Sequence, residues 1–234
     1  MQPAVRKHLV WREATVLEAR SESSSARTLR LDVPDWGEHV GGQHLDLRLT
    51  ADDGYQATRS YSVSSAPGEA PEITVERVED GEVSPYLVDD VEVGDTFEVR
   101  GPVGGYFVWN YTSDSQPLLL IGGGSGIAPL RAIWRDAKEK VPVTLLYSAR
   151  NQSRIIYGDE IAATSGVDGR IFLTRETAAG YQDGRIDESA IAEAVGSTKP
   201  SVFVCGPTAF VEAIATHLVA VDVDPKSIRT ERFG

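Results

Sequence analysis

Polar and apolar residues alternate along the first half of the chain. This period-two pattern runs from residue 8 to about 111, and turn residues such as Gly41-Gly42 and Asp80-Gly81 interrupt it. A strand with this pattern buries one face and exposes the other. Six strands are predicted, with one short helix at Ser84–Asp89: Leu9–Ala19, Ala26–Val33, Gln43–Leu49, Thr58–Ser64, Glu72–Val78 and Asp95–Gly101. We expect these strands to form a closed antiparallel β-barrel.

The pattern changes after a polar segment at residues 110–115. Apolar runs then alternate with helical stretches, which is typical of a parallel sheet covered by helices on both faces. Strands are predicted at Leu118–Ile121, Val143–Tyr147, Ile171–Leu173 and Val202–Cys205, and helices near 129–139, 158–163, 187–195 and 207–220. We therefore predict a β plus α/β protein of two domains. Residues 1–112 form a six-stranded antiparallel barrel, and residues 113–234 form a Rossmann-like parallel α/β domain.

Composition narrows the classes of function. The chain has 234 residues, and its 35 acidic and 23 basic side chains give a net charge of −12, which disfavours nucleic acids and anionic membranes as partners. Its single cysteine excludes an internal disulfide and a four-cysteine iron–sulfur or zinc site. No apolar run approaches the ~18 residues of a membrane-spanning helix. We expect a cytoplasmic monomer that holds no metal and binds neither nucleic acid nor membrane.

A glycine-rich loop follows the first apolar strand of the second half. The run Gly122-Gly123-Gly124-Ser125-Gly126 leads into a helix that opens near Pro129. Small residues let a diphosphate approach backbone N–H groups and the start of the helix. The loop lacks the Lys-Ser/Thr of a Walker loop, and Ile127 occupies the third glycine position of the GxGxxG dinucleotide fingerprint. By itself the loop favours a nucleotide site only slightly over an ordinary turn.

The barrel half carries a second candidate site in the run Arg59-Ser60-Tyr61-Ser62. Arg59 and Tyr61 alternate along one predicted strand and therefore share a face. Arginine can bind a phosphate there, tyrosine can pack on an aromatic ring, and the serines add hydroxyl groups. Taken alone, this run is better interpreted as an ordinary surface strand.

A third candidate lies where the chain enters the short helix of the barrel half. Gly81-Glu82-Val83-Ser84 forms a turn there, and Ser84 is the predicted N-cap residue. Such a helix start can bind a phosphate, although N-cap serines are also common where no ligand binds.

Five motifs occur in a fixed order along the chain. They are Arg59-Ser60-Tyr61-Ser62, Gly81-x-x-Ser84, the Gly122–Pro129 loop, Cys205-Gly206-Pro207 and Glu231-Arg232-Phe233. Together they resemble the ferredoxin–NADP(+) reductase family over nearly the whole chain. Any one motif is weak, but five in this order are strong. The resemblance implies a flavoprotein reductase in a stand-alone form without a ferredoxin domain.

The resemblance implies that the barrel binds FAD. Arg59 would bind the pyrophosphate within the element that also contains Ser60, Tyr61 would pack on the isoalloxazine, and Ser62 would lie near the flavin N5. The phosphate site would be completed by Gly81, Val83 and Ser84. FMN remains open as the less favoured cofactor.

The resemblance also implies roles in the α/β half. The diphosphate of a nicotinamide nucleotide would lie at Gly123, Gly124, Ser125 and Gly126, ahead of the helix opened by Pro129. The Cys205 thiol would lie beside the nicotinamide at a strand end formed with Gly206 and Pro207. The Glu231 carboxylate would lie by the nicotinamide, and Phe233 would cover the second face of the flavin. The implied catalytic residues are Ser62, Cys205 and Glu231.

The choice of nucleotide is partly readable. No acidic residue ends the second strand at Tyr147–Arg150, where an NAD site would place a carboxylate for the ribose. Thr174-Arg175 followed by Tyr181 resembles the Ser-Arg and Tyr element that binds the adenosine 2′-phosphate in NADP-using members. NADP(H) is therefore favoured over NAD(H), which remains open. The candidate residues for the adenosine end are Ser148, Arg150, Thr174, Arg175 and Tyr181.

The expected function is that of an FAD-dependent NAD(P)H oxidoreductase. It would pass a hydride from NADPH or NADH to FAD, and then single electrons to a ferredoxin or to an oxygenase or oxidoreductase component. One alternative is a free-standing flavin or quinone reductase. Another is a non-redox nucleotide-sensing module, which would not need the complete flavin set. The sequence does not identify the electron acceptor.

Overall fold

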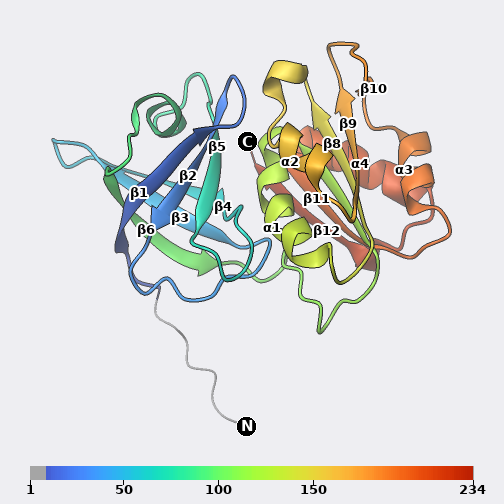
Figure 1. The fold of residues 1–234 in the computed structure, drawn as a ribbon, viewed down its shortest axis with the longest axis horizontal. Helices are drawn as coiled ribbons and strands as arrows, with labels where there is room; N and C mark the ends of the chain where they lie inside the picture. Colours follow the sequence, from blue (N-terminus) through green and yellow to red (C-terminus); the bar gives the residue numbers. More distant parts are fainter. Residues whose placement is uncertain (1–8, 234) are drawn as a thin grey trace, which may run out of the picture.

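The computed structural model describes residues 9–233 and contains two β-sheets that lie side by side (Figure 1). The first sheet has six antiparallel strands in the order β4-β3-β6-β1-β2-β5. Its strands are β1 (Arg12–Ser21), β2 (Ala26–Asp32), β3 (His44–Thr50), β4 (Gln56–Ser62), β5 (Glu72–Glu76) and β6 (Thr96–Val103). A single bridge between Val63 and Ile73 joins the end of β4 to β5. The predicted six-stranded barrel is therefore confirmed.

Alternation of side chains explains why the barrel strands form. On β3, Leu45 and Leu47 are fully buried in the barrel core. Asp46 and Arg48 point to the other face, where they pair with arginine and glutamate side chains of β6. Most strand ends differ from expectation by one or two residues, and the largest difference is that β1 begins at Arg12 rather than Leu9.

The second sheet is parallel throughout, in the order β10-β9-β8-β7-β11-β12. Its strands are β7 (Leu118–Gly123), β8 (Val143–Ala149), β9 (Val167–Leu173), β10 (Gln182–Asp183), β11 (Ser201–Pro207) and β12 (Ile228–Phe233). The four predicted strands correspond to β7, β8, β9 and β11. The two edge strands β10 and β12 were not predicted, because they lack the apolar runs that mark strands buried on both faces.

Helices cover both faces of this sheet. Leu118 and Leu120 of β7 belong to the core under α1 (Ile127–Ala137) and α2 (Gly158–Ala163), whereas Leu119 and Ile121 belong to the core under α3 (Glu188–Val195) and α4 (Thr208–Ala220). Burial on both faces requires the continuous apolar run seen in the sequence. Short 3₁₀ turns are η2 (Gly124–Gly126), η3 (Gln152–Arg154) and η4 (Pro225–Ser227).

Two local predictions need correction. α1 begins at Ile127, so Pro129 lies inside its first turn, where a missing N–H leaves no helical hydrogen bond unmade. The short helix of the barrel half begins at Ser84, close to the predicted start, and its residues Tyr86–Asp90 form the π-helical segment η1, so Ser84 is the first helical residue rather than the N-cap. The Ser84 hydroxyl instead accepts a hydrogen bond from the Val78 N–H at 3.0 Å, which closes the loop before the helix.

A buried polar network joins the two domains. Arg131 of α1 is 5% exposed and donates to Glu72 of β5 at 2.6 Å and to Glu160 of α2 at 2.7 Å. The hydroxyl of Tyr157 hydrogen-bonds Thr74 of β5. The predicted boundary between residues 112 and 113 stays a prediction. None of the helices within residues 9–233 is long and apolar enough to cross a membrane.

Candidate functional site

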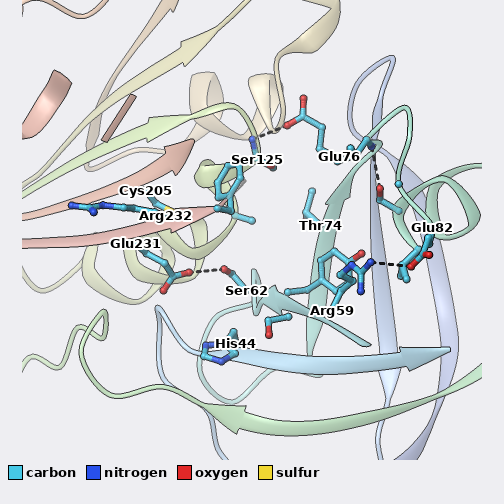
Figure 2. A pocket seen from close by; sticks show the side chains of 18 residues that line it. His44, Arg59, Ser62, Thr74, Glu76, Glu82, Ser125, Cys205, Glu231 and Arg232 are labelled. Atoms are coloured by element: carbon cyan, nitrogen blue, oxygen red, sulfur yellow. Dashed lines mark hydrogen bonds and ion pairs between the residues drawn. The ribbon is translucent and has the colours of Figure 1, made fainter. Parts of the chain in front are cut away.

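One cleft, here named the inner cleft, lies between the end of β4 and the ends of β11 and β12 (Figure 2). Its volume is about 630 Å³. Its lining includes these residues predicted from the motifs: Arg59, Ser60, Tyr61, Ser62, Gly81, Val83, Ser84, Ser125, Cys205, Glu231 and Phe233. The fold thus brings together residues from all five sequence motifs, with Ser125 alone representing the glycine loop.

The barrel wall of the inner cleft is formed by β4. Tyr61 is half-buried and presents an aromatic wall, and its burial raises the pKa of its hydroxyl to about 12, so the side chain is neutral at physiological pH. Arg59 shares this face, and its Nη2 donates to Glu82 at 3.1 Å. The β4 strand therefore holds a neutral ring and a guanidinium on one surface.

The opposite wall is formed by the paired strands β11 and β12. Their register places Cys205 beside Glu231, and the Ser62 hydroxyl donates to the Glu231 carboxylate at 3.1 Å across the cleft. Burial raises the pKa of Glu231, against the lowering effects of Ser62 and His44. Burial and then the Glu231 charge raise the pKa of the Cys205 thiol, which therefore stays protonated. This wall offers a neutral thiol next to a half-buried carboxyl group.

A neighbouring cleft, here named the outer cleft, has a volume of about 660 Å³ and follows the carboxyl ends of β7, β8, β9 and β11. Its lining includes the predicted residues Gly123, Gly124, Ser125, Ser148, Arg150, Thr174, Pro207 and Phe233. The two clefts share Glu76, Val78, Ser125 and Phe233. A molecule bound along the outer cleft can therefore extend into the inner one.

The glycines of the loop serve two different purposes. A Cβ at Gly126 would stand 2.2 Å from the Cys205 carbonyl oxygen, and one at Gly123 would stand 2.8 Å from the Phe210 ring. These two glycines are required because the loop packs against β11 and α4. Gly124 has a φ of +56°, and the nearest atom to a Cβ there is an oxygen of Glu76 at 3.2 Å. Gly124 thus borders the outer cleft, as Gly123 does, but without packing against β11 or α4.

Five predicted site residues line neither cleft: Gly126, Pro129, Arg175, Tyr181 and Gly206. Pro129 is buried in α1, and a Cβ at Gly206 would meet the Phe210 ring at 2.7 Å. Arg175 is exposed, and Tyr181 packs against the core under α1 and α2. The outer cleft is lined instead by Arg154 and by Arg77 of the barrel.

Several cleft residues were not predicted as site residues: His44, Thr74 and Glu76, which lie outside the motifs, and Glu82 and Arg232, which lie within them. Thr74 and Glu76 lie two positions apart on β5, so strand periodicity predicts that they share a face. Which cleft that face borders depends on the bridge from β4 to β5, which no local pattern predicts.

The inner cleft fits a flat aromatic cofactor with a phosphate tail. It combines the Tyr61 ring, the Arg59 guanidinium and the Ser62 hydroxyl, which are groups suited to a ring, a phosphate and a polar ring edge. Within residues 9–233, no group of His, Cys, Asp and Glu side chains could hold a metal ion.

Two known domain families match the chain. The oxidoreductase FAD-binding domain matches residues 13–108, and the oxidoreductase NAD-binding domain matches residues 120–216. The first match covers the barrel strands and the second begins in β7 and ends within α4. The barrel is therefore an FAD-binding domain and the α/β half an NAD(P)-binding domain.

Individual relatives agree with these matches. The ferredoxin reductase component of a 3-ketosteroid-9-alpha-monooxygenase from Mycobacterium tuberculosis is 31% identical over 94% of this chain, and the chain spans 65% of that relative's length. The FAD/NAD-binding domain of a nitric oxide dioxygenase from Vibrio cholerae superposes with a TM-score of 0.84, at 27% identity over 95% of this chain and 98% of its own.

A cytochrome P450 reductase from Amycolatopsis superposes with a TM-score of 0.85, at 29% identity over 96% of this chain and 71% of that protein. The chain spans less than two thirds of the length of the Mycobacterium relative, while both of its domains are matched in every case. The chain belongs to the ferredoxin–NADP(+) reductase-like family of FAD- and NAD(P)-dependent oxidoreductases.

Proposed function

We propose that this chain oxidises NAD(P)H and passes the electrons through FAD to a separate acceptor protein. The observation that carries the proposal is the inner cleft, where Tyr61 and Ser62 of the barrel face Cys205 and Glu231 of the parallel sheet. The proposal is supported because the barrel side of this cleft faces the carboxyl ends of strands, where parallel α/β sheets bind nucleotides. When bound, FAD accepts a hydride from the nicotinamide and releases electrons one at a time.

The barrel residues hold and orient the flavin in this proposal. Tyr61 packs on the isoalloxazine, and Arg59 exchanges Glu82 for the pyrophosphate, which is the stronger partner of a guanidinium. Further contacts to the flavin come from the same cleft: Ser60, Gly81, Val83 and Ser84. Phe233, at the end of β12, covers the second face.

The residues between the two domains position the reacting groups. Ser62 and Glu231 fix each other through their hydrogen bond, so that the hydroxyl and the carboxyl group stay at the edge of both rings. Cys205 is small and uncharged, and it closes the nicotinamide side of the cleft without introducing water. In this proposal Ser62, Cys205 and Glu231 act by positioning and by excluding solvent.

The cofactor assignment is tested by the absorbance spectrum of the purified protein. The protein should show a flavin spectrum that anaerobic NADPH bleaches, and Tyr61→Ala should lower the flavin content. Tyr106→Ala is the matched control, because Tyr106 is 66% exposed and lines neither cleft. A colourless protein after gentle purification would overturn the proposal, and equal flavin content in Tyr61→Ala would overturn the stacking role.

We also propose that NADPH is preferred to NADH. The support is the pair Arg150 and Arg154 in the outer cleft, beside Ser148 and Thr174. Arg154→Ala should raise KM for NADPH by roughly tenfold and leave KM for NADH nearly unchanged, since a charged hydrogen bond contributes about 1.5–3 kcal/mol. Arg175→Ala is the matched comparison, because Arg175 lies outside the cleft lining. Equal effects on both nucleotides would contradict the preference.

The proposed acceptor is a component of an oxygenase system. The Mycobacterium relative is named a ferredoxin reductase component of a monooxygenase, and the Amycolatopsis protein is named a cytochrome P450 reductase. Rapid mixing of NADPH-reduced protein with a ferredoxin or with the oxygenase should give acceptor reduction at the rate of turnover. Fast reduction of free flavin or quinone, with none of the protein acceptor, would favour the free-standing reductase instead. The cytoplasmic location and the monomeric state stay predictions.

A further inference from the structure

Glu76 occupies a particular place between the two clefts. It ends β5 of the barrel and lines both clefts, at the point where they meet. Its Oε2 accepts a hydrogen bond from the backbone N–H of Ser125 at 3.0 Å (Figure 2). The same oxygen lies 3.2 Å from the position of a Cβ on Gly124. A carboxylate of the barrel therefore binds the glycine loop of the other domain.

The bonded N–H belongs to the segment that a nucleotide diphosphate needs. Ser125 lies in η2, between the carboxyl end of β7 and the first turn of α1. In parallel α/β sheets, diphosphates bind where backbone N–H groups and a helix start lie together at this edge. A carboxylate and a phosphate are both anionic oxygen acceptors, so they compete for the same N–H.

Within the part of the chain that the structure describes, no basic side chain is paired with this carboxylate. Among residues 9–233, Glu76 forms no ion pair, and the neighbouring Arg77 is paired with Asp89 at 2.8 Å. The negative charge of Glu76 is therefore directed at the cleft, where it repels a diphosphate in addition to occupying the N–H.

We propose that Glu76 limits nucleotide affinity by competing with the diphosphate for the Ser125 N–H. A bound nucleotide must displace the carboxylate, and the carboxylate returns when the nucleotide leaves. Glu76 thus weakens the binding of both NADPH and NADH, because it acts on the part that the two share. This inference rests on the proposed function, which places a nicotinamide nucleotide along the outer cleft.

Binding of ADP-ribose and of adenosine to the FAD-loaded protein separates this effect from others. ADP-ribose carries the diphosphate and adenosine does not. Glu76→Gln and Glu76→Ala should each bind ADP-ribose roughly tenfold more tightly than the wild type, with adenosine affinity unchanged and KM for NADPH and NADH lowered together. Isothermal titration calorimetry provides the affinities, and the flavin spectrum verifies that each variant is folded.

Glu79→Gln is the matched control. Glu79 also lines the outer cleft and is exposed, but it makes no hydrogen bond with the glycine loop. Its replacement removes the same charge from the same cleft and should change ADP-ribose affinity by less than about twofold, because an exposed charge is well screened. An equal gain in Glu79→Gln would show a general charge effect and overturn the competition.

Two further outcomes are distinguishable. Unchanged or weaker ADP-ribose binding by both Glu76 variants would overturn the inference and show that Glu76 holds the loop in its binding conformation. Failure of the wild type to bind ADP-ribose, NADPH or NADH at all would overturn the proposed function, and this inference with it.

Discussion

At the scale of single residues, the hydrogen bond between Ser62 and Glu231 joins positions that are 169 residues apart. It holds the Glu231 carboxyl group in a half-buried site, where burial raises its pKa. A carboxyl group with a raised pKa disfavours the folded state once it is charged. Glu231 is therefore kept at a cost to stability, which is common for residues at functional sites.

Glu231→Gln should make the protein more stable at neutral pH. In the wild type, the contribution of protonated Glu231 to the free energy of unfolding is complete below the ordinary carboxyl pKa. It is lost as pH rises through the raised pKa of the folded state. The variant lacks this loss, so its melting temperature should exceed that of the wild type by about 1–3 °C at pH 7 and match it near pH 4. Thermal unfolding between pH 4 and 8 measures this difference. A less stable variant at pH 7 would contradict the sign.

Sequence motifs identified many residues of the inner cleft correctly as a group. Ser62, Cys205 and Glu231 were predicted as site residues because each belongs to one of the five motifs that occur in a fixed order. Thr74 and Glu76 belong to β5 and to no motif. They line the inner cleft only because the fold places β5 at its edge. Arg175 fits a motif but lies outside the cleft lining, since its side chain is on the exposed surface after β9.

At the scale of secondary-structure elements, the connection from β7 to α1 depends on close packing against β11 and α4. The backbone at Gly126 approaches the Cys205 carbonyl so closely that no side chain fits between them. The sequence suggested that the loop residues are small so that a phosphate can approach the backbone. At Gly126 the requirement comes from its neighbouring elements.

Gly126→Ala should destabilise the protein by about 3 kcal/mol or more. The added Cβ would stand 2.2 Å from the Cys205 oxygen, and both groups belong to backbone that cannot move independently. Gly105→Ala is the control, because a Cβ there meets no atom within 4 Å, and we expect a change below about 0.5 kcal/mol. Urea unfolding measures both. Similar stability of the two variants would show that β11 shifts to accommodate the methyl group.

Arg131→Met should cost about 3–5 kcal/mol of unfolding free energy. Its removal takes the nearest cation from Glu72 and Glu160, which are left with only longer pairs to other arginines, Arg20 at 4.0 Å and Arg135 at 3.5 Å. Arg135→Met removes a more exposed arginine from the same helix, with its pair to Glu69 and a longer pair to Glu160 at 3.5 Å, and should cost about 0–1 kcal/mol because Glu160 keeps Arg131. Chemical denaturation of the two variants gives the comparison. Equal losses would show that the buried network contributes no more than a surface pair.

At the scale of the whole molecule, the proposed reaction site lies between two domains. The proposed flavin wall belongs to the barrel, the proposed nucleotide edge belongs to the parallel sheet, and α1 and β5 are joined through Arg131. Neither domain contains a complete inner cleft. The whole molecule also carries a net charge of −12, which acts on any partner that approaches.

The rates of electron transfer to a basic and to an anionic test acceptor should change in opposite directions as the salt concentration rises. Reduction of cytochrome c, a basic protein, should slow as ionic strength rises from about 0.02 M to 0.5 M, because salt screens its attraction to the acidic chain. Reduction of ferricyanide, an anion, should accelerate over the same range. Stopped-flow traces of the reduced protein report both rates. A cytochrome c rate that increases with salt would show a positive surface at the point of electron exit.

The sequence by itself determined the two architectures, their order and most of the motif residues. Strand periodicity, continuous apolar runs and glycine turns express local geometry, so they are readable without knowing what packs where. The tertiary structure decided which residues meet: Ser62 with Glu231, Arg131 with Glu72, and Glu76 with the Ser125 N–H. These contacts join segments distant in the chain, and their geometry depends on how the barrel and the parallel sheet dock, which no local pattern encodes.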